Sequence, residues 1–378
     1  MTITINKRSL SHRILIISAV LTAACALMAA HFHEDQSKRI ANYTILEPIT
    51  QGNLTVFPVA TESVHDTHIF LTLDDGIRSG QVVVAEEGGS PGMVRPRPRE
   101  GVVPREYPPP RSGAEVNRLT LTNNSDRALL LLAGEIVTGG KQDRVVGIDR
   151  IIPAKSGPVD LGVFCVEPHR WTGDSARFGG FNFAMAQPSV RKKAMADKDQ
   201  SAVWNEVAKS RMAVAAAAPP AAYGISRSSS YADAMQNRFV QDKVNAVAAP
   251  MERSYDKLFG KLRAQHAVGA VVAVDGQILW ADIFASPALF EAYWPKLVRS
   301  YATEALEGHI EPTQTYGPPS IKSAEDFLYD LNSKRENVES EPGLYRETEL
   351  LGDNFEAFVL TSLLPGTGFD VHIAKMRN

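Results

Sequence analysis

Strand-like and helical segments are separated along this chain, and that separation constrains the fold more than any other feature. Between residues 40 and 190 the apolar stretches are short, rich in β-branched and aromatic residues and bounded by turn residues, as in Asn53–Val59 and Val159–Val166. From about residue 200 to 308, apolar residues recur at helical spacing. Strands do not alternate with helices, which disfavours a parallel α/β sheet. The sequence therefore predicts an α+β fold, with a predominantly antiparallel β body and helices packed on it.

The region 268–284 carries the clearest hairpin signal. Asp275-Gly276 lies between two strand-like runs, Val268–Val274 and Gln277–Phe284. An Asp-Gly pair readily adopts the positive φ angles of a tight turn. We therefore expect this hairpin within the helical part of the chain.

Turn and helix signals set further boundaries. Asp74-Asp75-Gly76 predicts a turn, and Pro250 should kink or split a long helix. The segment 90–112 is rich in proline and arginine, which predicts a loop. We expect the tail, 309–378, to complete the same globular unit with three strands, around Glu347, Phe358 and Val371.

Residues 1–30 have the pattern of an export signal. They contain three basic residues and no Asp or Glu, and the basic residues lead into an apolar run. That run is shorter than the roughly 20 residues that a membrane-spanning helix needs. The mature protein is therefore expected in the periplasm or anchored to the envelope. Two processing routes stay open: ordinary cleavage around Ala24-Cys25-Ala26, or lipidation of Cys25, which would provide the only membrane contact.

The charge balance disfavours one class of partner. The whole chain has a formal net charge of −3, and loss of the basic signal makes the mature chain more acidic. No overall basic charge is then available to attract nucleic acid.

Once Cys25 is removed or lipidated, Cys165 has no cysteine with which to form a disulfide. Packing must therefore stabilise the fold.

Several segments of the chain resemble those of one bacterial family. The segments are Leu119–Arg127, Ala133–Arg144, Asp149–Ala154, Val163–Pro168 and Asp275–Ser286. They are similar to the ARG and Rhodanese-Phosphatase-superfamily-associated protein domain, where ARG stands for ADP-ribosylglycohydrolase. The resemblance extends from about Ile45 to Leu306. The function of that family is undetermined, so the resemblance implies no activity, catalytic residue or cofactor.

The densest polar cluster between apolar strands lies at residues 135–150. Its acidic members could serve as a general base, and its glycines and basic residues could hold an anion. The glycine spacing is not that of a phosphate-binding P-loop. The candidate catalytic residues are Glu135, Asp143 and Asp149. The candidate ligand-binding residues are Gly139, Gly140, Lys141, Gln142, Arg144 and Arg150.

The same cluster has a structural interpretation. A two-residue turn at Gly139-Gly140 would place Glu135 opposite Arg144 as a cross-strand ion pair. In a continuous strand, Asp143 and Asp149 would share one face. Arg144 and Arg150 would share the other. Both interpretations stay open.

A second candidate cluster consists of Cys165, Glu167 and His169, which should project from one face of a strand. The three could act as nucleophile, acid and base. No third or fourth metal ligand lies nearby in the sequence, so a metal is not predicted. A buried structural cysteine is the simpler alternative.

Two other groups of polar and aromatic residues have structural interpretations. His65, Asp66 and His68 are expected in a solvated loop that leads into a strand. Phe290, Tyr293, Trp280 and Trp294 fall where a hairpin and a helix should meet, so we expect them in the core.

Three functional hypotheses follow from these features. The first is an exported ligand-binding or interaction module, because no complete catalytic constellation is recognisable. The second is a hydrolase or transferase that acts on a phosphorylated or ADP-ribose-type ligand, with a small anionic ligand held by Lys141, Arg144 and Arg150. The third is a structural envelope protein. The sequence indicates neither a cofactor nor a particular protein partner.

Overall fold

The computed structural model describes residues 43–86, 118–139, 142–166, 177–217, 231–308, 318–330 and 332–378. The export signal, Cys25 and the segment 90–112 lie outside the described residues. No helix in these described ranges is long and apolar enough to cross a membrane. The predicted α+β class is confirmed, since mostly antiparallel sheets are covered by helices.

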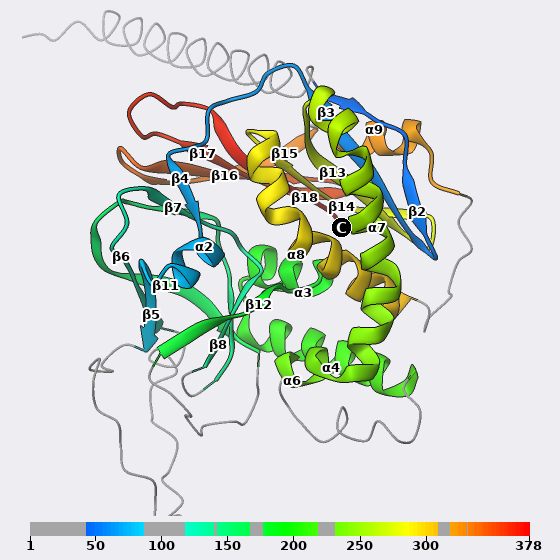
Figure 1. The fold of residues 1–378 in the computed structure, drawn as a ribbon, viewed down its shortest axis with the longest axis horizontal. Helices are drawn as coiled ribbons and strands as arrows, with labels where there is room; N and C mark the ends of the chain where they lie inside the picture. The colour runs from blue at the N-terminus through cyan, green and yellow to red at the C-terminus, as the bar shows by residue number, and fades with distance from the viewer. Residues whose placement is uncertain are drawn as a thin grey trace, which may run out of the picture.

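The largest element is a 9-stranded antiparallel sheet, in the upper part of Figure 1. Its strand order is β1-β3-β13-β14-β18-β17-β16-β15, with β2 paired to β3. The sheet joins the start of the described chain to its end. Its strands are β1 (Tyr43–Ile45), β2 (Ile49–Gln51), β3 (Leu54–Thr61), β13 (Ala267–Val274), β14 (Gln277–Phe284), β15 (Ser333–Glu341), β16 (Tyr345–Gly352), β17 (Phe355–Ser362) and β18 (Asp370–Arg377).

A closed barrel occupies the lower left of Figure 1. Its strand order is β11-β6-β5-β12-β8-β9, and β9 pairs with β11 to close it. The barrel strands are β5 (Val82–Glu86), β6 (Arg118–Asn123), β8 (Glu135–Gly139), β9 (Arg144–Val146), β11 (Ser156–Cys165) and β12 (Arg177–Met185). A small sheet of β4 (Phe70–Thr72), β7 (Ala128–Leu131) and β10 (Arg150–Ile152) adjoins it, with β4 parallel to β7.

Helices pack on both faces of the large sheet and beside the barrel (Figure 1). They are α2 (Leu73–Arg78), α3 (Pro188–Lys192), the π-helix η1 (Lys193–Asp197), α4 (Gln200–Ala217), α6 (Tyr231–Gln236), α7 (Arg238–Ala264), α8 (Pro287–Gly308) and α9 (Ile321–Tyr329). Alternate residues of β13 supply the two cores. Val272 packs in the core that includes α8, whereas Val271 packs in the core that includes α9. Burial on both faces explains why β13 is almost wholly apolar.

The predicted hairpin at 268–284 is confirmed as β13 and β14, with Asp275 and Gly276 at positive φ. The expected strands around Glu347, Phe358 and Val371 are also present, as β16, β17 and β18. The sequence did not reveal β15. Most of its side chains are charged or polar and partly or fully exposed, which suits an edge strand but gives no apolar signal.

One local prediction was wrong, and one was wrong in part. Asp74-Asp75-Gly76 is not a turn but part of α2, because the Thr72 side chain caps the helix by accepting a hydrogen bond from the Asp75 backbone N–H at 3.2 Å. Pro250 was expected to kink or split the long helix; α7 is continuous over 27 residues, which excludes the split.

Candidate functional site

Glu135 and Asp149 both bind the turn that leads from β7 into β8. The backbone N–H of Leu132 donates to Glu135 Oε2 at 2.8 Å, and that of Ala133 donates to Asp149 Oδ1 at 2.7 Å. Gly134 completes the turn at φ +95°, where an added Cβ would lie 2.5 Å from the Arg191 side chain. Only glycine fits this position without rearrangement. The two predicted catalytic carboxylates therefore hold a buried turn.

Glu135 continues into a buried ion cluster. Lys296, from α8, lies 2.5 Å from Glu135 Oε1 and 2.7 Å from Asp74 Oδ2, from α2. Burial raises the pKa of Glu135, against the opposing charge of Lys296. Burial alone would lower the pKa of Lys296, but the two carboxylates outweigh it and raise that pKa. One ammonium group thus joins the barrel to two helices.

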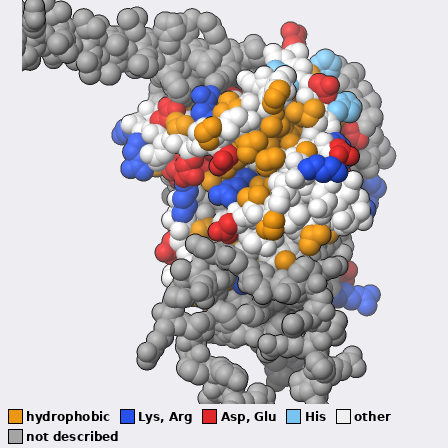
Figure 2. All heavy atoms as spheres, turned by 90° about the vertical axis from the view of Figure 1, so that its left-hand side faces the viewer, with side chains coloured by type: hydrophobic (Ala, Val, Ile, Leu, Met, Phe, Trp, Pro, Cys, Tyr) orange, Lys and Arg blue, Asp and Glu red, His pale blue; other side chains and the backbone are white. Residues whose placement is uncertain are grey.

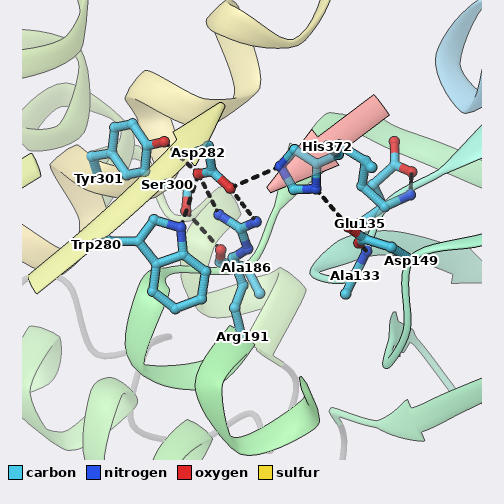
Figure 3. A network of polar contacts seen from close by, with 11 residues as sticks. Ala133, Glu135, Asp149, Ala186, Arg191, Trp280, Asp282, Ser300, Tyr301 and His372 are labelled. Carbon is cyan, nitrogen blue, oxygen red and sulfur yellow. Dashed lines mark hydrogen bonds and ion pairs between the residues drawn. The ribbon is translucent and has the colours of Figure 1, made fainter. Parts of the chain in front are cut away.

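Asp149 continues into a second network, which Figure 3 shows from close by. His372 Nδ1 lies 2.5 Å from Asp149 Oδ2, and His372 Nε2 lies 3.1 Å from Asp282 Oδ1. Burial opposes the charged imidazolium, but Asp149 and Asp282 prevail and raise the pKa of His372 to about 9. A protonated His372 therefore bridges two carboxylates at neutral pH.

Asp282 is the most heavily bonded member of this network (Figure 3). Arg191 donates to both of its oxygens, at 2.9 and 2.8 Å. Trp280 Nε1 at 2.9 Å and the Tyr301 hydroxyl at 2.5 Å also donate to Asp282 Oδ2. Burial would raise the pKa of Asp282, but Arg191 and His372 hold it far below its usual range. The carboxylate stays ionised without contact with water.

The whole network is closed to solvent. Asp149, Arg191, Asp282 and His372 each have 0% exposure. These residues come from the barrel side, from α3 and from the large sheet, so the network ties the three parts together. In this conformation it can stabilise the fold and hold protons, but it offers no atom to a solute.

The register of the β8–β9 hairpin corrects the predicted Glu135–Arg144 ion pair. Val137, not Glu135, is paired with Arg144, so the connection is longer than a two-residue turn. Arg144 is buried and donates to Gln142 Oε1 and to the Asp143 carbonyl, each at 3.3 Å. Gln142 and Asp143 are buried as well.

The predicted basic face is not assembled as one strand surface. Arg144 belongs to the barrel, whereas Arg150 belongs to the small sheet and donates to the Asp160 carbonyl at 2.9 Å. Asp143 and Asp149 likewise do not share a continuous strand, since β9 ends at Val146. Gly139 ends β8, while Gly140 and Lys141 lie outside the described residues.

Cys165 is fully buried at the end of β11. Its backbone exchanges two hydrogen bonds with the Gln200 side chain, at 2.9 and 2.8 Å. Glu167 and His169 lie outside the described residues, so the proposed reactive cluster stays a prediction. Across the described ranges, no group of three His, Cys, Asp or Glu residues has the geometry to hold a metal ion.

A groove of about 300 Å³ lies where the barrel meets η1 and β15. We call it the barrel groove. Among the described residues that line it, apolar side chains dominate, and one lysine and one glutamate are charged. It is lined by Gly147, Ile148, Gly162, Val163, Phe164, Ala194, Lys198 and Glu339. Val163 and Phe164 belong to a family-like segment of the sequence, Gly162 and Ile148 each directly adjoin one, and Ile148 directly precedes Asp149.

A second hollow, of about 620 Å³, lies between the loop at 64–68 and the start of α8. His68 and Asp66 are 2.6 Å apart, with side chains 92% and 79% exposed, which confirms a solvated loop. His65 stacks on Phe369, with ring centroids 4.2 Å apart.

Figure 2 views the molecule from the left-hand side of Figure 1. On the side that faces the viewer, hydrophobic side chains gather in the upper half, next to acidic and basic ones.

Four charged members of the buried networks were not singled out from the sequence: Arg191, Asp282, Lys296 and His372. Three of them stand singly within apolar stretches, as Asp282 does in Gln277–Phe284. A charged residue in a strand that is apolar on both faces signals a buried partner. That signal indicates burial but does not identify the partner. Phe290, Tyr293, Trp280 and Trp294 are buried, as predicted.

Comparison with known proteins identifies one family. No curated protein and no solved structure shows significant similarity to the chain. The sequence profile of one family matches residues 42–374, which include every described strand and helix except the last residues of β18. The chain therefore belongs to the family of the ARG and Rhodanese-Phosphatase-superfamily-associated Protein domain.

Proposed function

We propose that this protein is an exported ligand-binding module that receives a small ligand in the barrel groove. The observation that carries the proposal is the position of the groove: four of its lining residues belong to or directly adjoin family-like segments, and one of these, Ile148, precedes the fully buried Asp149. A concave, mostly apolar site with a few polar groups is typical of small-ligand binding. The N-terminal signal supports export.

Binding is favoured over catalysis by the burial of the candidate bases. A general base must come within hydrogen-bond reach of a water or a substrate. Glu135 and Asp149 are 1% and 0% exposed, and both already accept backbone hydrogen bonds. A hydrolase or transferase that used them would have to open the core. The groove, in contrast, is open to a ligand without such a change.

Two glycines of β11 provide a matched test. Gly162 lines the groove, and a Cβ there would make only ordinary contact with Ile148, at 3.8 Å. Gly157 is exposed on the same strand, and a Cβ there would meet nothing within 4 Å. Leucine at position 162 should therefore fill the groove, whereas leucine at position 157 should leave it empty.

The experiment is a thermal-shift screen of the mature wild type, Gly162→Leu and Gly157→Leu. The panel contains ADP-ribose, nucleotides, sugar phosphates, apolar amines and apolar acids. A ligand at 100 times its Kd adds about 2.7 kcal/mol of stability. We expect at least one class to stabilise wild type and Gly157→Leu but not Gly162→Leu. The proposal fails if no compound distinguishes the groove variant from its control.

A further inference from the structure

Glu347 lies beside a groove residue in the large sheet. In the sheet register it is directly opposite Glu339, which lines the groove, so the two side chains share one face. Asp149, the residue after the groove member Ile148, lies close enough for its backbone N–H to favour the ionised form of the Glu347 carboxyl group. Glu347 thus lies next to the groove residue Glu339 of β15 and close to Asp149, which follows the groove residue Ile148.

The Glu347 carboxyl group is incompletely bonded. The residue is only 4% exposed, yet its Oε1 atom has no hydrogen-bond partner among the described residues. Buried polar atoms are nearly always hydrogen-bonded, and each exception needs an explanation. Burial, with the neighbouring Asp149, raises the pKa of Glu347 to about 8. A ligand that donates a hydrogen bond would satisfy this atom.

The backbone that carries Lys198 is unusual. The π-helix η1 ends at Asp197, and Lys198 follows with φ +50°, in the left-handed region that non-glycine residues seldom adopt. Strained residues and π-helical turns are concentrated at functional sites. This geometry brings Lys198 Nζ to 3.3 Å from Glu349 Oε2, over the acidic sheet face.

The balance of charge around the groove is acidic. Lys198 contributes the one basic side chain among the described residues that line the groove, and its ammonium already contacts Glu349. Glu339 and Glu347 add two carboxyl groups on the same sheet face. Ile148, Val163, Phe164 and Ala194 supply apolar walls. A ligand that suits this site carries a hydrogen-bond-donating cation at one end and an apolar body at the other.

We infer that the barrel groove binds a small organic amine, with its ammonium group at Glu347 and Glu339 and its apolar body against Ile148 and Phe164. The inference rests on the proposed function and specifies its ligand class. It differs from the anion that the sequence predicted: Arg144 and Arg150 do not line the groove, and Lys141 lies outside the described residues. Binding should strengthen as pH rises from about 6 to 8.5, since an ionised Glu347 pairs best with an ammonium ion.

Several charged groups surround Glu347 and set this pH dependence. Asp149 and Glu339 disfavour its ionised form, while Lys198 favours it. The amine itself stays protonated until about pH 10. The expected affinity therefore passes through a maximum between these two ionisations, and proton release should accompany binding near pH 7.

The test is isothermal titration of the mature protein with phenethylamine, 2-phenylethanol and phenylacetate. The alcohol keeps the apolar body without charge, and the acid reverses the charge. We expect the amine to bind wild type at least tenfold more tightly than either analogue. Glu347→Gln should weaken amine binding roughly ten- to hundredfold, because a charge-assisted hydrogen bond is lost. Glu339→Gln, an exposed change, should weaken it less.

The controls separate a binding role from a structural one. Glu341→Gln, on β15 but not in the groove lining, should bind the amine like wild type. Glu347→Gln should keep the thermal stability of wild type or exceed it, because burial of a carboxylate is relieved. Equal amine affinity in wild type and Glu347→Gln, or no amine binding at all, would overturn the inference. A different ligand class blocked by Gly162→Leu would then leave the proposed function standing.

Discussion

At the scale of single residues, Gly134 sets the geometry of the buried turn. Its φ of +95° and the 2.5 Å that would separate an added Cβ from the Arg191 side chain both exclude a larger residue. We predict that Gly134→Ala lowers the free energy of unfolding by about 2–4 kcal/mol, as other strained or overpacked core changes do. Urea denaturation of the mature protein measures this change.

Gly157→Ala is the matched control for that prediction. Gly157 has an ordinary backbone conformation and open space around it, so alanine there should change stability by no more than about 0.5 kcal/mol. If the two substitutions cost the same, the contact between Gly134 and Arg191 is not what constrains position 134.

At the scale of elements, α2 places Asp74 against Lys296. Thr72 caps this short helix, and Asp74 lies in its first turn, 2.7 Å from Lys296 Nζ. We predict that Thr72→Ala costs about 1 kcal/mol of stability and also weakens the ion pair. In a double-mutant cycle with Asp74→Asn, the two changes should be non-additive by at least about 0.5 kcal/mol.

Ser320→Ala provides the comparison, because Ser320 caps α9 through its side chain, as Thr72 caps α2. The helix that it caps packs in another core, away from Lys296. Combined with Asp74→Asn, Ser320→Ala should give additive costs. Additive costs for Thr72→Ala as well would show that capping does not position Asp74.

Elements were predictable where local chemistry and burial agreed. The β13–β14 hairpin combines an Asp-Gly turn with two apolar strands, so pattern and turn pointed to one structure. The sequence of α2 contains turn-forming residues, and its helix depends on the Thr72 cap, which a search for apolar periodicity overlooks. The polar edge strand β15 is defined by its pairing with β16, and the sequence of β15 alone does not predict this pairing.

The candidate site was predictable only in part, because the residues that contact one another in it lie far apart in the sequence. Glu135 and Asp149 stand out because they fall in a polar cluster between apolar strands. Their partners Lys296 and His372 lie 161 and 223 residues away, so no local spacing could connect them. The register of β8 and β9 depended on a connection whose length the glycine pair did not reveal.

At the scale of the whole molecule, the buried network should make stability fall as the solution becomes basic. His372 has a pKa of about 9 in the folded protein, above the ordinary value of 6.5. Its contribution is therefore fully present below about pH 6.5 and is lost as pH rises through 9. The loss amounts to something on the order of 3 kcal/mol. Glu307 and Glu347, with pKa values raised to about 8 by burial, act in the same direction.

We predict that His372→Gln flattens this decline. Wild type should lose stability between pH 6.5 and 9, whereas the variant should be less stable at pH 6.5 and lose less over the same range, because His372 no longer titrates while other groups with raised pKa values, such as Glu307 and Glu347, still do. Urea denaturation at a series of pH values measures both profiles. His68→Gln, at a side chain 92% exposed, is the control and should follow wild type. Parallel profiles for wild type and His372→Gln would mean that His372 does not hold its extra proton between Asp149 and Asp282, and the charge balance of the core would have to be assigned differently.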